Sequence, residues 1–200
     1  MSPGQIVVLN GAPRSGKSSI AAAIQETFDG LWVNLGVDVA RSMTPARFQP
    51  GIGLRPGEPD HPAAPVVPVL YAALYGSIAA HADEGVNVVT DVGHHDVAIL
   101  RDCARRLAGR RAVLVGVRCP IEVVMERRNA SAPGSYATGA PDDPPAPVRR
   151  WQEDVHVPGV YDLDVDTSVS SPEDCADAIR RLLAEMPSPT AFERLAASEV

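Results

Sequence analysis

Short apolar runs alternate along the chain with longer segments in which apolar residues recur every three or four positions. The runs have the length of buried strands, and the longer segments have the spacing of amphipathic helices. Strands separated by helices pair in parallel and are covered by helices on both faces. The pattern therefore predicts one domain over residues 1–200, with a three-layer α/β/α fold and a five-stranded parallel sheet. The expected strands are residues 5–10, 31–37, 86–91, 112–117 and 160–165, and the expected helices are residues 17–28, 69–84, 97–107, 120–129 and one capped by Ser171.

Two proline-rich segments interrupt this alternation. Residues 45–68 and 131–150 together hold 12 of the 19 prolines. Because proline lacks a backbone N–H, neither segment is expected to be a core element. Long loops in a compact domain are usually lids or binding loops, and a mobile surface insertion is the alternative. The segment after Pro187, residues 187–200, is expected to fray or to pack on a partner.

Composition and charge narrow the possible functions. The 200 residues carry a net charge of −7, which disfavours nucleic acid or an anionic membrane as a partner. The odd number of cysteines, Cys103, Cys119 and Cys175, indicates buried thiols in a reducing compartment rather than disulfides. The apolar run at residues 6–9 is too short for a signal or membrane segment, and no basic residues precede it. We therefore expect a cytoplasmic protein, with its oligomeric state open, a homodimer or larger assembly included.

The first apolar run leads into a phosphate-binding motif. Gly11-Ala-Pro-Arg-Ser-Gly-Lys-Ser18 fits G-x-x-x-x-G-K-[ST] without deviation, between a predicted strand and a predicted helix. The glycines let successive N–H groups turn toward phosphates, and the helix directs its positive end at the same place. The motif predicts a P-loop kinase that uses ATP, with Lys17 at the β- and γ-phosphates. The residues expected to hold the nucleotide are Gly11, Ala12, Pro13, Arg14, Ser15, Gly16, Lys17, Ser18 and Ser19.

A carboxylate follows the third predicted strand, where a P-loop enzyme requires one near its metal ion. Asp91 ends the run Val-Asn-Val-Val-Thr-Asp, at the sheet edge where open α/β folds bind ligands. We expect Ser18 and Asp91 to hold Mg²⁺, with Thr90 able to add a hydroxyl. The alternative is an aspartate that only caps a turn.

A second carboxylate, Asp38, ends the second predicted strand in Leu35-Gly-Val-Asp38. Placed opposite the P-loop, it can accept the proton of an attacking hydroxyl group. The alternative is an N-cap for the short segment 39–42.

Four blocks of this sequence resemble the chloramphenicol phosphotransferase family. They are residues 10–18, Leu35-Gly-Val-Asp38, Val115-Gly-Val-Arg-Cys119 and the segment 155–167, which holds Val155-His and Tyr161-Asp-Leu-Asp-Val-Asp-Thr167. The resemblance spans most of residues 5–184. It implies the fold of nucleotide-monophosphate kinases and ATP- and Mg²⁺-dependent phosphorylation of a primary hydroxyl group of the antibiotic, which confers resistance. It also implies that Asp38 is the catalytic base.

The predicted lid, residues 127–150, departs from this family. Arg127 and Arg128 are expected to touch phosphate and assist catalysis, with solvated helix-end cations as the alternative. Residues 129–148 contain no arginine, and Arg149 and Arg150 follow. These two either fold back onto the site or leave the lid short of positive charge. Arg118 is expected to contact the nucleotide, and a structural salt bridge is equally compatible with its position.

The acceptor is expected to be a small molecule with a hydroxyl group, in contact with the proline-rich loop 45–68. Met43, Phe48, Ile52 and Leu54 offer an apolar wall, and Arg41, Arg47 and Gln49 offer polar contacts. A chloramphenicol-like antibiotic is the first candidate. A metabolite, nucleotide or sugar-nucleotide kinase and a non-catalytic nucleotide-binding protein are the alternatives. His94 and His95 fit a solvated or acceptor-facing loop better than a metal pair.

Overall fold

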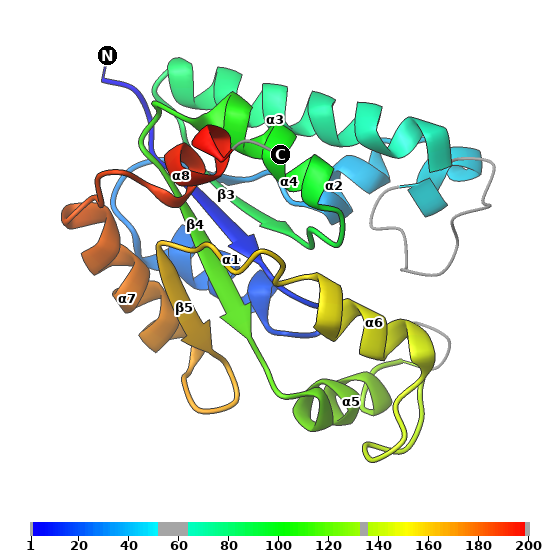
Figure 1. Ribbon diagram of the computed structural model, residues 1–200. Helices are drawn as coiled ribbons and strands as arrows, with labels where there is room; N and C mark the ends of the chain where they lie inside the picture. Colours follow the sequence, from blue (N-terminus) through cyan, green and yellow to red (C-terminus); the bar gives the residue numbers. More distant parts are fainter. Residues whose placement is uncertain (1, 52–63, 133–135, 199–200) are drawn as a thin grey trace.

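The computed structural model describes residues 2–51, 64–132 and 136–198, and these residues surround a five-stranded sheet. The strand order is β2-β3-β1-β4-β5, and every pairing is parallel (Figure 1). This confirms the predicted α/β architecture. The strands are β1 (Ile6–Asn10), β2 (Trp32–Asn34), β3 (Asn87–Val92), β4 (Ala112–Arg118) and β5 (Leu163–Asp166).

Helices cover both faces of the sheet, so the central strands are apolar along their whole length. In β1, Ile6 and Val8 face one core, whereas Val7 and Leu9 face the other. The first core lies under α3 (Val67–Asp83), α4 (Val97–Leu107) and α8 (Ala191–Ala197), and the second under α1 (Lys17–Thr27) and α7 (Pro172–Ala184) (Figure 1). The remaining elements are α2 (Val37–Ser42), α5 (Ile121–Asn129), α6 (Ala146–Asp154) and the 3₁₀ turns η1 (Ala46–Gly51) and η2 (Ala64–Val66).

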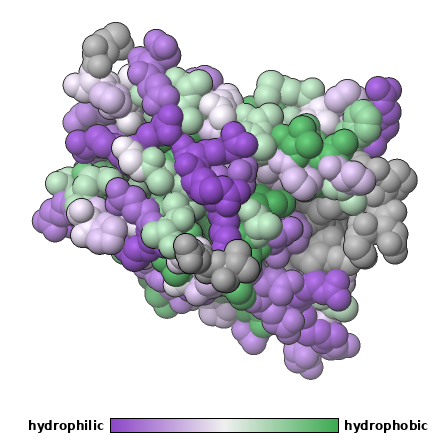
Figure 2. Space-filling view, turned by 45° about the horizontal axis from the view of Figure 1, so that its top comes forward, coloured by the Kyte–Doolittle hydropathy of each residue, from purple (hydrophilic) through white to green (hydrophobic). Residues whose placement is uncertain are grey.

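Helix α3 is the most apolar helix of the described chain. With η2 it forms a stretch, Ala64–Asp83, that is long and apolar enough to cross a membrane by length and composition alone. In this fold Tyr71, Tyr75 and Ile78 of α3 are buried against the sheet, as in the core helix of a folded domain. Hydrophobic side chains on the face shown in Figure 2 stand in small groups among hydrophilic ones.

The second strand is shorter than predicted. It ends at Asn34, whose side-chain oxygen accepts a hydrogen bond from the N–H of Gly36 at 2.8 Å and so turns the chain out of the sheet. Gly36 is then the N-cap of α2, and Asp38 lies in the first turn of that helix. The expectation that Asp38 ends a strand is therefore wrong, and so is the alternative that it caps the helix.

Two helices were absent from the predicted pattern. Helix α6 forms inside the proline-rich segment 131–150, with Pro147 in its first turn, where no intrahelical N–H donor is needed. Its Val148 is buried, so the expectation that this segment contributes nothing to the core is wrong. Helix α8 starts at a Thr190 capping box and buries Phe192 in the first core. The described part of the tail is thus packed on its own chain rather than frayed.

Candidate active site

The P-loop connects β1 to α1 and wraps around the side chain of Lys17. The Lys17 ammonium donates hydrogen bonds to the carbonyl oxygens of Gly11 and Ala12, each at 2.8 Å. Gly16 caps α1 with a φ of 97°, a conformation that glycine adopts without a steric cost. Arg14 adopts a φ of 74°, which is unusual for a residue with a side chain. The loop therefore has the inward-turned geometry that the motif predicts.

Burial changes the acid–base properties of this lysine. Desolvation lowers the pKa of Lys17 to about 8, although the nearby carboxylates of Asp91 and Asp38 act in the opposite direction. The two carboxylates are therefore electrostatic neighbours of the same ammonium group. Phosphate oxygens at this position would stabilise the charged form of Lys17.

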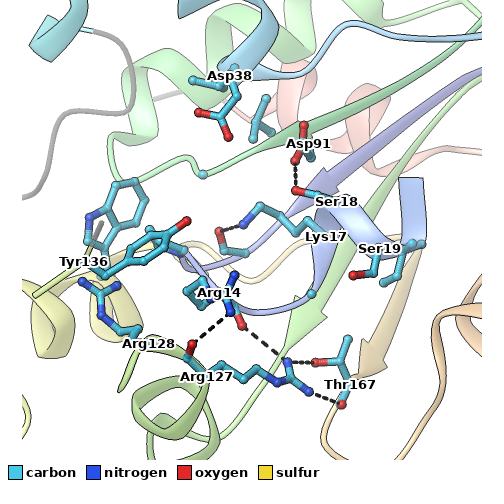
Figure 3. A pocket seen from close by; sticks show the side chains of 18 of the residues that line it. Arg14, Lys17, Ser18, Ser19, Asp38, Asp91, Arg127, Arg128, Tyr136 and Thr167 are labelled. Atoms are coloured by element: carbon cyan, nitrogen blue, oxygen red, sulfur yellow. Dashed lines mark hydrogen bonds between the residues drawn. The ribbon is translucent and has the colours of Figure 1, made fainter. Parts of the chain in front are cut away.

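Ser18 and Asp91 lie together, as the sequence predicts. The Ser18 hydroxyl donates to Oδ2 of Asp91 at 2.6 Å (Figure 3). The pairing follows from the sheet register, because Asp91 of β3 stands beside Leu9 of β1 just before the P-loop. A hydroxyl and a carboxylate at the mouth of a phosphate-binding loop are the oxygen ligands that suit Mg²⁺. Thr90 is buried and donates its hydroxyl to the carbonyl of Leu35 at 2.8 Å, so it does not join them.

The lack of a side chain at Gly36 leaves room for the carboxylate of Asp91. A Cβ atom on Gly36 would lie 1.8 Å from Oδ1 of Asp91. The φ of Gly36 is −72°, so the backbone conformation itself would accept any residue. Glycine is needed here for space alone, which ties the start of α2 to the position of the carboxylate.

The P-loop and both carboxylates line one cavity of about 1010 Å³. Asp38 reaches it from α2, and its side chain is 85% exposed with Arg41 3.9 Å away. The cavity extends from the P-loop toward α2 and α3 on one side and toward α5 and the loop after β5 on the other. Its lining includes Gly11, Pro13, Arg14, Gly16, Lys17, Ser18, Ser19, Val37, Asp38, Arg41, Tyr71, Asp91, Val92, Gly93, Arg127, Arg128, Tyr136, Trp151, Thr167, Ser170 and Pro172.

The two arginines at the end of α5 line the cavity, yet each is engaged by the protein. The Arg127 guanidinium donates to the Thr167 hydroxyl at 3.0 Å and to the Thr167 carbonyl at 2.7 Å (Figure 3). Arg128 donates through Nε to the carbonyl of Ala137 at 3.0 Å and lies over the ring of Tyr136. The alternative that Arg127 and Arg128 are solvated cations at a helix end is therefore wrong.

Three other arginines lie away from the cavity lining. Arg118 pairs with Asp164 at 2.7 Å and lies over the ring of Tyr161, so the salt bridge that its position allowed is observed, and its contact with the nucleotide stays a prediction. Arg149 pairs with Asp143 at 3.2 Å, and Arg150 is exposed on the same helix. The lid segment thus adds no arginine to the lining beyond Arg127 and Arg128.

Two residues of the motif, Ala12 and Ser15, have buried side chains.

A buried polar network holds the strand end that precedes the P-loop. The Asn10 amide donates to the Val155 carbonyl and to the Tyr161 hydroxyl, both at 2.7 Å, and its oxygen accepts from the His94 N–H at 2.8 Å. Nε2 of His94 hydrogen bonds with the Tyr75 hydroxyl at 2.7 Å. Burial, and to a lesser extent the neighbouring His95, lowers the pKa of His94 to about 3. A solvated loop is therefore the wrong description of His94, which is a neutral structural residue.

Aromatic residues of the cavity were not found as site residues from the sequence. Trp151 of α6 packs with Ala12 under the P-loop, and a Cβ on Gly93 would come within 2.7 Å of its ring. Tyr71 of α3 and Tyr136 of the lid also line the cavity. No local motif in the sequence marks any of the three. Of the expected acceptor-loop residues, Ile52 and Leu54 lie outside the described residues.

Fold and site together define the class of P-loop kinases, and comparison with solved structures agrees. The Mycobacterium tuberculosis APS kinase CysC, in complex with AMPPNP and APS, superposes with a TM-score of 0.63 at 18% identity, over 92% of this chain and 99% of that one. Shikimate kinase from Aquifex aeolicus superposes with a TM-score of 0.57 at 16% identity, over 90% and 97% of the chains. At these identities the likeness establishes the fold.

Sequence comparison then gives the family. Residues 4–184 match the model described as chloramphenicol phosphotransferase-like protein, so the chain belongs to that family and is a small-molecule kinase. A Mycobacterium tuberculosis protein, named only provisionally as an O-phosphotransferase, is 26% identical over 210 residues, covering 98% of this chain and 89% of the relative. The resemblance read from the four sequence blocks is confirmed.

Proposed function

We propose that the protein transfers the γ-phosphate of ATP, bound with Mg²⁺, to a hydroxyl group of a small neutral molecule, with a chloramphenicol-like antibiotic as the first candidate. The observation that carries this proposal is one cavity lined by both the P-loop lysine and the Asp38 carboxylate. Phosphoryl transfer needs a phosphate cradle and a proton acceptor on opposite sides of the reacting atoms.

The nucleotide is proposed to bind on the side of α5 and the loop after β5. The N–H groups of the P-loop and the N-terminus of α1 would receive the phosphates, with Lys17 replacing its two carbonyl partners by phosphate oxygens. Arg127 would bound the nucleotide from the lid side, because it links Thr167 to the P-loop.

Ser18 and Asp91 are proposed to hold Mg²⁺, Asp91 directly or through water. Bound there, Mg²⁺ would neutralise part of the phosphate charge. The short hydrogen bond between the two side chains already places both oxygens together, so little rearrangement is needed.

Asp38 is proposed to orient the acceptor hydroxyl and to take its proton. Its carboxylate faces the cavity from α2 and is exposed to water, which leaves oxygen lone pairs available for a hydroxyl donor. Gly36 fixes the start of α2 close to Asp91, so the proposed base is held near the proposed metal site.

The acceptor side supports a neutral, partly apolar substrate. Tyr71, Trp151, Val37 and Val92 supply aromatic and aliphatic surface. Arg41 is the cationic side chain that lines this side among the described residues, and Asp38 offsets its charge at 3.9 Å. A strongly anionic acceptor would meet little positive charge there. The buried free thiols of Cys103, Cys119 and Cys175 support the reducing cytoplasm as its location.

The test is to incubate the protein with Mg-ATP and chloramphenicol and to look by mass spectrometry for a product heavier by one phosphoryl group. Asp38→Asn should keep ATP affinity and lose at least about 100-fold in transfer, because the proton acceptor is gone. Asp142→Asn, an exposed aspartate outside the cavity lining, is the control and should behave as the wild type.

Each alternative has its own outcome. Full transfer by Asp38→Asn would remove Asp38 as the base. ATP binding without any chloramphenicol product would move the substrate to another hydroxyl compound, found with an acceptor library. ATP binding with no transfer to any acceptor would favour a non-catalytic nucleotide-binding protein.

A further inference from the structure

The lid of this kinase is poor in the positive charge that phosphoryl transfer requires. Negative charge spreads over the transferring group, and P-loop kinases stabilise it with arginines or lysines. Here residues 129–148 contain no arginine. Arg149, which follows them, pairs with Asp143 at 3.2 Å outside the cavity lining. The charge has to come from elsewhere in the site.

The arginines at the end of α5 are tied to other groups. Arg127 donates to both oxygens of Thr167 and, at 3.4 Å, to the carbonyl of Arg14. Arg128 is buried, with Nε on the Ala137 carbonyl and its guanidinium over Tyr136. Using Arg127 on the phosphate would break a contact between the lid and the P-loop, and using Arg128 would break contacts within the lid.

Arg14 belongs to the P-loop itself, and fewer protein contacts hold its guanidinium than hold that of Arg127. Its side chain is exposed and lines the cavity between Lys17 and Arg127 (Figure 3). One of its five N–H donors bonds the Arg127 carbonyl at 2.9 Å, and its guanidinium lies 5.3 Å from the centroid of the Tyr136 ring. Among the described residues no further hydrogen bond of this guanidinium is observed, which leaves N–H groups for a ligand.

The backbone of Arg14 is held in an unfavourable conformation. A φ of 74° is the left-handed region, where a side chain crowds the following carbonyl and glycine is preferred. Such strain persists where surrounding contacts enforce it, and it concentrates at functional sites. Here the conformation places a guanidinium, rather than the bare backbone of a glycine, against the phosphate end of the cavity.

We propose that Arg14 is a catalytic residue that supplies, from within the P-loop, the charge that the lid lacks. This rests on the proposed function. The acceptor oxygen forms a bond to the γ-phosphorus, the bond from phosphorus to the β–γ bridging oxygen breaks to leave ADP, and the acceptor proton passes to Asp38. Arg14 forms and breaks no covalent bond. Its planar fork donates two hydrogen bonds to the transferring group, and Tyr136 and the Arg127 carbonyl hold it in place.

The experiment follows the loss of the labelled γ-phosphate from bound Mg-ATP in single-turnover reactions, with chloramphenicol or with water as acceptor. Arg14→Gly removes the side chain and suits the observed φ, so the variant should fold with an unchanged or higher thermal midpoint. We expect a roughly 100- to 1,000-fold slower reaction with ATP affinity changed less than about threefold. Arg14→Lys, which keeps the charge but not the fork, should recover only part of the rate. Arg149→Ala is the matched control and should react as the wild type.

Two results would overturn the role of Arg14. One is a rate within about fivefold of the wild type in Arg14→Gly, and the other is an ATP affinity that falls as much as the rate, which would mean ordinary substrate binding. If the wild type transfers phosphate to water but not to chloramphenicol, the proposed acceptor is wrong. The rates of the wild type and Arg14→Gly with water then still test the role of Arg14.

A second measurement covers the case in which the wild type releases no phosphate. Aluminium fluoride with Mg-ADP mimics the transferring group, so the wild type should bind this pair more tightly than Mg-ADP alone. Arg14→Gly should bind Mg-ADP with the same affinity in the presence and absence of aluminium fluoride. The proposal would be overturned if aluminium fluoride did not tighten binding of Mg-ADP by the wild type, or if it tightened binding equally in Arg14→Gly.

Discussion

Replacing Gly36 with alanine should damage the proposed metal site without touching any metal ligand. The added Cβ would lie 1.8 Å from Oδ1 and 3.0 Å from Cγ of Asp91, far inside the closest approach that Cβ atoms show. Because the backbone of Gly36 is in an ordinary extended conformation, the clash is the whole effect. The carboxylate has to rotate or shift by more than about 1 Å to reach a normal van der Waals separation.

That shift breaks the hydrogen bond from Ser18 to Asp91, now 2.6 Å long. Hydrogen bonds to charged groups contribute about 1.5–3 kcal/mol. The lower end applies because Ser18 is exposed and water can replace the lost partner. Because the displaced carboxylate no longer stands beside the Ser18 hydroxyl where the metal would bind, we expect roughly tenfold weaker binding of Mg-ATP, or about 1.4 kcal/mol. ATP without metal should bind Gly36→Ala about as well as it binds the wild type.

The assay is titration with a fluorescent ATP analogue in Mg²⁺ and again in a chelator, with urea unfolding to check the fold. Gly76→Ala is the matched control, since a Cβ there has no atom within 4 Å and lies inside helix α3. It should keep Mg-ATP affinity and gain about 0.5–1 kcal/mol of stability. An unchanged Mg²⁺ dependence in Gly36→Ala would refute the assignment of Ser18 and Asp91 as the metal site.

Two further predictions concern pH. The pKa of Lys17 is about 8 in the free protein, so ATP affinity should fall as the ammonium is lost above that pH, by roughly 30-fold at pH 9.5; a flat profile between pH 7 and 9.5 would contradict it. The pKa of His94 is lowered from 6.5 to about 3, so the unfolded state takes up its proton first. The free energy of unfolding should therefore decline as pH falls from 6.5 toward 3, by about 2 kcal/mol at pH 5. In urea titrations His94→Gln should show a shallower decline, and equal slopes in both proteins would count against this cause.

The features predicted correctly from the sequence are those set by local chemistry. The P-loop motif fixes its own turn, because Gly16 must be left-handed and Lys17 must face inward. The alternation of strands and helices determines a parallel sheet, and the sheet register then brings Asp91 beside the P-loop. The capping box at Ser171 begins α7 where expected. The P-loop turn and the capping box depend on neighbouring residues alone, and the parallel sheet follows from the order of strands and helices along the chain.

The features that were missed depend on contacts between distant segments. Helix α6 begins in a proline-rich stretch, and its formation is favoured by the burial of Val148 and Trp151, which no local pattern reveals. Helix α8 has a capping box, but its Phe192 gains a core position only once α3 and α4 are in place. The pairing of Arg118 with Asp164 links β4 to β5, and no local pattern in the sequence reveals it.

The strand order has a consequence for how such a protein can diverge. Since β1 is central, the segments that bound the proposed acceptor side follow β2 and β3, apart from Trp151 of α6, whereas Arg127 and Thr167 on the proposed nucleotide side follow β4 and β5 (Figure 1). Substitutions around α2 and α3 can accumulate without disturbing the contacts of Arg127 with Thr167. On the proposed function, new substrate preferences can arise by substitutions in the acceptor half of the molecule while selection preserves the nucleotide half, so the proposed acceptor half is the better place to look for what separates this chain from its relatives.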